Sequence, residues 1–462
     1  MNSERFFMSI FTVLRDLRTD REFRRKLTAL TIPITLQSLM LALVAAADAL
    51  MLGRLGQSPM AAVSLATQIQ FVQNMILFGV VSGTGILGAQ YWGKQDIPVL
   101  GKILGSSIRE AFLVSLIFFA ACRWFPVPLM KLFASDPELV AIGAEYLQVA
   151  AWSYLITGVS QCYLAMMRVS GQATRSAWIS SGAVVLNIGL NAVFIFGLAM
   201  IPALGVKGAA LATVAARIIE LIWCIVSSCQ RGFIRIKWRD LVRFDWPLIA
   251  DFWRYASPVM ASCLLWGIGF TAYTALMGHM GPDAAAANAV AAVVRDLLCC
   301  LCNGIGGAAA VLIGNELGAG ALERARGYGQ RAMVLSFFIG FTCTLLILAS
   351  IPLFAALVKR TPQAQDYLTG MFVILSIYMI GRCACTVVIN GIFSAGGDTC
   401  FDMYSLCVCM WGIALPCAFL GAFYFHWPVL VVYACTCLDE VGKVPWVIWH
   451  FSRYKWVKNL TR

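Results

Sequence analysis

The sequence predicts an all-α membrane protein with twelve transmembrane helices in two parallel-related six-helix lobes. Three observations lead to this fold class: the composition, the long apolar segments and an internal repeat. Of the 462 residues, 60% are hydrophobic and only 13% are charged, whereas about 25% of the residues in a soluble protein are charged. Most of the molecular surface is therefore expected to contact lipid.

Twelve apolar segments are each long enough to span the membrane. About 20 residues cross the roughly 30 Å of hydrocarbon as a helix that rises about 1.5 Å per residue. We expect helices over residues 30–52, 62–92, 102–124, 139–167, 176–198, 205–229, 248–279, 285–316, 328–358, 365–394, 403–425 and 428–450. Because the number of spans is even, the two termini lie on the same side of the membrane.

Residues 1–27 form a basic tail before the first span. Phe7, Ile10, Phe11 and Leu14 recur at helical spacing, and arginines follow them. This pattern is typical of an amphipathic helix on an anionic membrane surface. The alternative interpretation is a solvated basic tail whose charges only set the orientation of the protein in the membrane.

Lysine and arginine are distributed unevenly between the two sides of the predicted bundle. The loops on the side of the termini carry 23 of them, and the opposite loops carry six. Since basic loops stay in the cytoplasm, both termini are predicted to be cytoplasmic. The same loops account for the net charge of +12, so we expect the lipid bilayer as a partner and no nucleic acid.

The second half of the chain repeats the first at a constant offset of 225 residues. The aligned pairs include Pro33 with Pro258, Gly53 with Gly278, Gly56 with Gly281, Gly79 with Gly304 and Gly171 with Gly396. Small residues and prolines are found where membrane helices cross or break. We therefore expect an N-lobe over 28–230, a cytoplasmic linker over 231–247, and a C-lobe with a basic tail over 248–462. Two such halves around a central cavity are typical of transporters.

Six segments resemble the multidrug and toxic compound extrusion (MATE) family. They are Asp48–Gly56 (DALMLGRLG), Gly88–Asp96 (GAQYWGKQD), Asn187–Gly197 (NIGLNAVFIFG), Gly205–Val214 (GVKGAALATV), Ile313–Gly320 (IGNELGAG) and Ile392–Thr399 (IFSAGGDT). The resemblance covers about residues 30–455 and implies an exporter of amphipathic, often cationic small molecules that works by alternating access. It implies antiport of H⁺ or Na⁺ with no other cofactor. We expect a monomer in the cell membrane of a bacterium.

Asp48 lies within the first span, where an ionisable group is costly unless it is paired or hydrated. Apolar surroundings favour a protonated or cation-paired carboxyl over the free carboxylate. The resemblance implies that Asp48, Asn187, Asn191 and Thr213 form the cation-coupling site, with Asp48 as a metal ligand if the ion is Na⁺. Some family members carry a second acid in place of Asn191, so the identity of the coupling ion, H⁺ or Na⁺, stays open. The alternatives are a surface aspartate near the outer interface and asparagines that only bond neighbouring helices.

Polar and aromatic residues of other spans are candidates for the substrate cavity. Gln68, Gln70 and Asn74 belong to a polar cluster in the second span, for which bonding between helices is the alternative. Trp266 and Tyr273 in the seventh span could stack on flat cationic ligands, or they only pack against neighbours. Many family members have a glutamate where this chain has Trp266.

Asp296 in the eighth span is the acid that the C-lobe offers to a substrate or a coupling ion. A structural ion pair with Arg295 or Arg382 is the alternative. The side chains of Arg295 and Asp296 leave a helix about 100° apart, so a direct pair between them is not required by their sequence positions.

Other charged residues in the spans are expected to form structural salt bridges. Arg217 and Glu220 are three residues apart, and Lys443 follows Asp439 and Glu440 within one helical turn. The 17 cysteines lack zinc-type spacing with histidine partners, so we interpret them as small apolar residues.

A lipid-linked oligosaccharide or lipid flippase of the same superfamily is the alternative function. Such a flippase needs several basic residues in its cavity, and few occur in the spans: Arg109, Arg217, Arg295 and Arg382. The sequence contains no HExxH, GxSxG or Walker-type motif. We therefore do not expect an enzyme.

Overall fold

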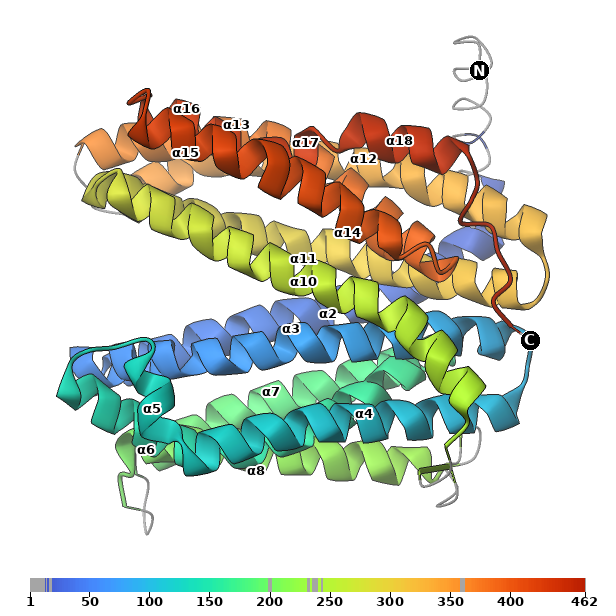
Figure 1. The fold of residues 1–462 in the computed structure, drawn as a ribbon, viewed down its shortest axis with the longest axis horizontal. Coiled ribbons are helices and arrows are strands. Elements are labelled where there is room, and N and C mark those ends of the chain that lie inside the picture. The colour runs from blue at the N-terminus through green and yellow to red at the C-terminus, as the bar shows by residue number, and fades with distance from the viewer. Residues whose placement is uncertain are drawn as a thin grey trace. The chain divides into compact units, whose positions relative to one another are not determined.

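The computed structural model describes residues 13, 15, 19–197, 202–230, 233–234, 240–241, 244–357 and 362–461, without the side chains of 353–357. The elements in these ranges are helices (Figure 1). The amphipathic helix predicted within residues 6–14, and much of the predicted linker 231–247, fall outside the described residues.

The chain folds into two compact units. The N-unit consists of residues 36–260, and the C-unit consists of residues 1–35 and 261–462. The two boundaries are separated by the 225-residue offset of the repeat, and they lie inside α2 (Arg21–Gly53) and α10 (Trp246–His279). Both follow the repeated proline, Pro33 or Pro258, by a few residues. Each of these two helices therefore contributes to both units, whereas the lobes expected from the sequence are divided at 231–247.

The N-unit is built mainly from six further helices. They are α3 (Gln57–Gly93), α4 (Ile97–Trp124), α5 (Pro126–Lys131), α6 (Pro137–Val169), α7 (Ala173–Phe196) and α8 (Gly205–Ser228). Helix α6 packs against α3, α4 and α8, and α7 packs against α8 (Figure 1, blue to green). Asp96 and Asp136 cap the starts of α4 and α6 by accepting backbone N–H groups, which satisfies donors that a helix leaves free.

The C-unit repeats this plan with more interruptions. Its elements are α11 (Pro282–Gly318), α12 (Leu322–Leu357), α13 (Pro362–Cys385), the π-helix η1 (Thr386–Phe393), α14 (Cys400–Leu406), the π-helix η2 (Cys407–Ala414), α15 (Leu415–Phe423), α16 (Val429–Thr436), α17 (Leu438–Val441) and α18 (Val444–Ser452). Helices α11, α12 and α13 pack against one another. The spans predicted over 365–394 and 403–425 thus contain π-helical turns, which are rare and often occur at functional sites.

Equivalent glycines permit the same close helix contact in both units. Gly79 of α3 lies against Met260 of α10, and Gly304 of α11 lies against Thr35 of α2. At either glycine an added Cβ would clash with the facing residue. Both the glycines and their partners are related by the 225-residue offset, so the repeat inferred from the sequence extends to individual contacts.

Eleven helices in the described residues are long and apolar enough to span a membrane. The twelfth predicted span, 428–450, is not one helix, because it is divided into α16, α17 and α18. The predicted twelfth span is therefore helical, but it consists of three consecutive short helices. Gly442 and Lys443 separate α17 from α18, and Pro445, which lacks the N–H needed for a helical hydrogen bond, lies in the first turn of α18. The first span also begins earlier than predicted, at Arg21 rather than residue 30.

Most of the described cysteines are buried in the helical core, as expected for small apolar side chains. Cys302 of α11 and Cys383 of α13 are an exception, because a disulfide joins them. Cys343 of α12 lies beside this pair. The prediction that all cysteines are simple packing residues was therefore incomplete.

Candidate functional site

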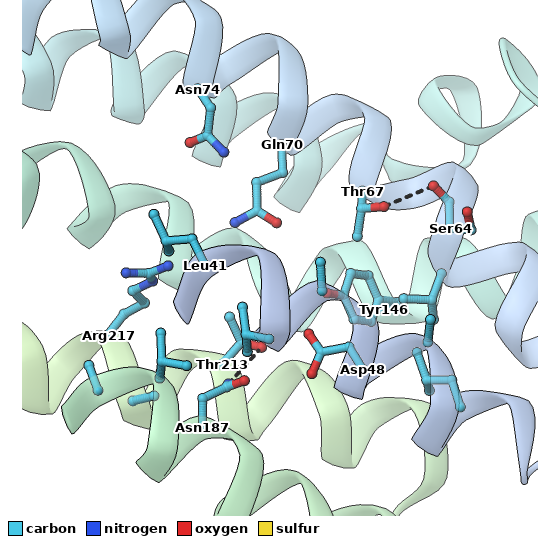
Figure 2. Close-up of a pocket in the computed structure, with 18 of the residues that line it drawn as sticks. Leu41, Asp48, Ser64, Thr67, Gln70, Asn74, Tyr146, Asn187, Thr213 and Arg217 are labelled. Carbon is cyan, nitrogen blue, oxygen red and sulfur yellow. Dashed lines mark hydrogen bonds between the residues drawn. The ribbon is translucent and has the colours of Figure 1, made fainter. Parts of the chain in front are cut away.

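The N-unit contains a cavity of about 540 Å³, within the range of about 300–1,000 Å³ that is typical of small-molecule sites. Residues of α2, α3, α6, α7 and α8 line it. Figure 2 shows the side chains of Asp48, Gln70, Asn74, Asn187 and Thr213 around this space. The rest of the lining is largely aliphatic, so the cavity combines an apolar surface with a few polar groups.

A chain of hydrogen bonds links Asp48 of α2 to α7 and α8. The Asn191 amide donates to Asp48 Oδ1 at 2.6 Å and to Asn187 Oδ1 at 3.2 Å. The Asn187 amide in turn donates to Thr213 Oγ1 at 3.4 Å. Because Asn187 and Asn191 are one helical turn apart, both face the same side of α7. The structure thus brings all four predicted coupling residues together.

This cluster offers oxygen atoms to a small cation. The Asn191 Oδ1 atom is buried and accepts no hydrogen bond within the described residues, and the amide nitrogen of the same side chain contacts the Asp48 carboxylate. Oxygen ligands of this kind suit a hard cation such as Na⁺. A protonated Asp48 would also fit, since the neighbouring amide and hydroxyl oxygens accept hydrogen bonds.

The charges that line the cavity are not equivalent. Arg217 donates to Glu220 at 2.6 Å, which confirms the pair predicted from the sequence and balances the guanidinium charge. Among the described residues, no basic side chain forms an ion pair with Asp48. The cavity therefore carries one uncompensated carboxylate, which attracts a proton, a metal ion or a cationic ligand.

The polar cluster of the second span divides into two parts. Gln70 and Asn74 line the cavity, whereas Gln68 is exposed and does not line it. Two residues along a helix correspond to a rotation of about 200°, which turns Gln68 away from the face of Gln70. Gln73 donates to the Tyr154 carbonyl at 2.9 Å and so bonds two helices. Gln68 thus lies outside the N-unit cavity, and its assignment to the substrate cavity stays a prediction.

The candidates of the C-lobe do not form a comparable site within the C-unit. Trp266 and Tyr273 line a cavity of only about 30 Å³, which is enough for one water-sized species but not for a drug-sized ligand. Asp296 does not line this cavity. Its carboxylate accepts two hydrogen bonds from Arg295, at 3.0 and 2.9 Å. The long arginine side chain bridges the angle between neighbouring positions, so Asp296 forms an ion pair with Arg295.

Several cavity residues were missed in the sequence. Ser64 and Thr67 line the cavity on the same helix as Gln70 and Asn74 (Figure 2). These four polar residues recur every three to four positions, a spacing that marks one face of a helix and could have identified them. Tyr146 of α6 also lines the cavity, but nothing in its local sequence distinguishes it from a packing residue.

The described helices are apolar and of membrane length, and they form two repeat-related units. One unit holds a ligand-sized cavity with a carboxyl group that has no ion-pair partner among the described residues. These features define a polytopic membrane transporter. The MatE family model matches residues 33–193 and 258–420, two segments that begin at Pro33 and Pro258. The chain belongs to the MatE family, whose members are transporters rather than enzymes. The family resemblance seen in the sequence is thereby confirmed.

Relatives and solved structures agree with this assignment. The chain is 24% identical over 417 residues to the uncharacterized transporter YisQ of Bacillus subtilis, covering 90% of this chain and 91% of the relative. It is 26% identical over 401 residues to a "Probable multidrug resistance protein NorM" of Bradyrhizobium diazoefficiens, covering 86% of each. A mutant of the Vibrio cholerae MATE transporter VcmN has the same fold, with a TM-score of 0.85 at 19% identity over 93% of this chain and 96% of that chain.

Proposed function

We propose that this protein exports amphipathic, often cationic small molecules by alternating access, driven by inward movement of H⁺ or Na⁺. The observation that carries the proposal is the uncompensated carboxylate of Asp48 in a cavity of about 540 Å³. The relative named as a multidrug resistance protein supports the same substrate class. The cell membrane, with both termini in the cytoplasm, is the proposed location.

Asp48 would couple the two movements through its charge. In a membrane layer an ionised carboxylate is stabilised by a proton, a metal ion or a cationic ligand. Only one of these is needed to balance the single charge, so the coupling ion and a cationic substrate compete for the same cavity. Binding of one would favour release of the other, which is the requirement for antiport.

The cavity lining favours amphipathic ligands over phosphorylated ones. Its aliphatic side chains offer apolar contacts, while Gln70, Asn74 and Thr67 offer hydrogen bonds. The one basic residue among the lining residues, Arg217, already pairs with Glu220. A pyrophosphate-linked flippase substrate would need free basic groups, so this cavity supports an exporter.

The proposal is tested with purified protein in liposomes loaded with ethidium. A pH gradient and a sodium gradient are imposed in separate experiments, each with an otherwise identical buffer. We expect efflux that exceeds the no-gradient rate under at least one of them. Equal rates with both gradients and without any would exclude cation-coupled export of this substrate class.

The bond between Asn191 and Asp48 leads to a first prediction. Asn191→Ala should weaken the apparent affinity for the coupling cation about tenfold, because a hydrogen bond to a charged group contributes about 1.5–3 kcal/mol. The measurement is the efflux rate as a function of cation concentration. Asn74→Ala is the control, since it changes the same cavity but not the Asp48 cluster. A similar cation dependence in the two variants would contradict a role for Asn191 in ion binding.

The charge asymmetry of the loops leads to a second prediction, on orientation. Lys455 follows the last helix, and Lys207 lies at the start of α8. In a background without the exposed Cys229, Cys400 and Cys407, an impermeant thiol reagent applied to intact cells should label Lys207→Cys but not Lys455→Cys. Lysed cells, in which both positions should react, serve as the control. Labelling of position 455 in intact cells would reverse the proposed topology.

A further inference from the structure

Three cysteines of the C-unit form a buried cluster of sulfur atoms. Cys302 of α11, Cys343 of α12 and Cys383 of α13 place their Sγ atoms within 4.8 Å of one another. The three residues are at most 1% exposed. Since α11, α12 and α13 pack against one another, the cluster lies where three helices meet. Cysteine is a common small apolar core residue, but packing alone does not require three of them at one point.

The cluster has two redox states. In the structure a disulfide joins Cys302 and Cys383, and Cys343 is a free thiol. Two molecules of a small cellular thiol reduce this disulfide by thiol–disulfide exchange, which leaves two protein thiols and one new disulfide between the small molecules. The reduced cluster therefore offers three thiols to one ligand, whereas the oxidised cluster offers one.

Three sulfurs at this spacing suit a single thiophilic atom. Two sulfurs that are both bound to one atom at about 2.3 Å, as in zinc–thiolate sites, lie at most about 4.6 Å apart. The observed spacing of 4.8 Å or less therefore requires only small movements of the side chains. Because each sulfur comes from a different helix, one bound atom would link α11, α12 and α13.

The apolar surroundings decide which thiophilic ligand the cluster favours. The cysteines share a hydrophobic core with residues such as Ile347 and Met379, and Arg382, which precedes Cys383, is already paired with Glu440. A divalent metal ion held by three thiolates leaves one net negative charge, which is costly away from water. It avoids this charge only if one sulfur keeps its proton and binds more weakly.

A trivalent arsenical leaves no charge on the cluster. Arsenious acid, As(OH)₃, reacts with three thiols to give one arsenic atom with three As–S bonds and three molecules of water. Three As–O bonds and three S–H bonds break, and neither arsenic nor sulfur changes its oxidation state. Both the reactant and the product are neutral, so the reaction leaves no charge in the apolar core.

We propose that the reduced cluster of Cys302, Cys343 and Cys383 binds one trivalent arsenical through three As–S bonds. Arsenious acid is small and uncharged at neutral pH, so it enters a buried apolar site more readily than a hydrated metal ion does. Oxidation to the disulfide removes two of the three ligands and prevents binding. The proposal does not depend on the proposed transport function.

The test is intact-protein mass spectrometry of purified protein incubated with sodium arsenite. All samples carry Cys229→Ser, Cys400→Ser, Cys407→Ser and Cys417→Ser, which remove three exposed thiols and one of a neighbouring pair. After reduction with a phosphine, we expect the mass to increase by one arsenic atom minus three hydrogen atoms per chain. This increase identifies arsenic with three sulfur ligands. No such adduct in the reduced protein, or the same adduct in the disulfide form, would overturn the proposal.

Cys343→Ala removes one ligand and leaves the disulfide-forming pair intact. The affinity for arsenite should fall at least about 100-fold, because an additional intramolecular contact strengthens binding by about that factor or more. Cys224→Ala is the matched control, since Cys224 is an equally buried cysteine of α8 in the N-unit. It should bind arsenite as tightly as the background protein. An undiminished affinity in Cys343→Ala, or an equal loss in both variants, would contradict the three-thiol site.

Thermal unfolding separates binding from misfolding. A ligand that binds only the folded protein raises its Tm, so arsenite should raise the Tm of the reduced background protein and of Cys224→Ala more than that of Cys343→Ala. A cooperative transition of Cys343→Ala without arsenite shows that it is folded, and Cys343→Ser, which keeps the shape of the side chain, replaces it otherwise. Cadmium ions are the second probe. A larger rise in Tm with cadmium than with arsenite at equal concentration would assign the cluster to divalent metal ions instead.

Discussion

Replacing Asp48 with asparagine should lower gradient-driven efflux at least about 100-fold. Asparagine keeps the shape of the side chain but cannot ionise or bind a proton, so the single uncompensated charge of the cavity disappears. Loss of one partner from a buried charge interaction costs about 2–5 kcal/mol, and each 1.4 kcal/mol corresponds to a factor of about ten. The yield of folded protein should stay within about twofold of wild type, since no base is left without its acid.

The measurement is ethidium efflux from liposomes under the gradient that drives the wild type. Asp366→Asn is the matched control, because it makes the same chemical change at an exposed position near the start of α13. This control should transport at the wild-type rate. Efflux by the Asp48 variant within about threefold of wild type would contradict coupling through this carboxylate.

Most of the helical framework was predictable because lipid imposes a simple rule on sequence. Apolar segments must be about 20 residues long to cross the hydrocarbon, and eleven of the twelve predicted spans correspond to long apolar helices in the described residues. The repeat was predictable for a related reason. Gly79 and Gly304 lie at close helix contacts, where only a small residue fits. These contacts therefore require glycine at equivalent positions, and the repeat can be seen in the sequence.

The break in the twelfth span could not be placed from hydropathy alone. The segment 428–450 is apolar on average, but it contains Glu440, whose charge is stabilised by Arg382 from a helix far away in the sequence. The mean hydropathy of neighbouring residues carries no information about a contact with a residue that is distant in sequence. Pro445 and the three charged residues before it were the available signal, and they indicate the interruption only when they are weighed together.

The residues of the candidate site were predictable where an ionisable group lies in an apolar span, because its burial is energetically costly. Residues whose burial costs less were harder to predict. Asp48 is an acid in an apolar span, so its burial had to be explained by partners, and the structure supplies Asn191. Gln68 lies outside the N-unit cavity because a polar cluster in sequence covers more than one face of a helix. Asp296 was harder, since the reach of the Arg295 side chain, rather than its position on the helix, decides the ion pair.

The largest stability effect is expected at the ion pairs of the broken twelfth span. Glu440→Gln removes the carboxylate that Arg382 and Lys443 contact and leaves these two bases without an ion-pair partner among the described residues. Breaking a buried ion pair from one side costs about 3–5 kcal/mol, because the remaining charge stays without water or a counter-ion. Thermal unfolding in detergent should therefore show a free energy of unfolding lower by about 3 kcal/mol, with a reduced yield of folded protein.

A control variant must show that the loss of stability comes from the burial of the charges and not from the loss of any ion pair. Glu145 and Lys207 form a pair at 2.5 Å with side chains 47% and 51% exposed, so Glu145→Gln should cost less than about 1 kcal/mol. Adding Lys443→Met to Glu440→Gln removes one charge of each sign and should recover at least half of the lost stability. Equal losses for Glu440→Gln and Glu145→Gln would mean that the buried charges reach water, and the cost assigned to their burial would then be wrong.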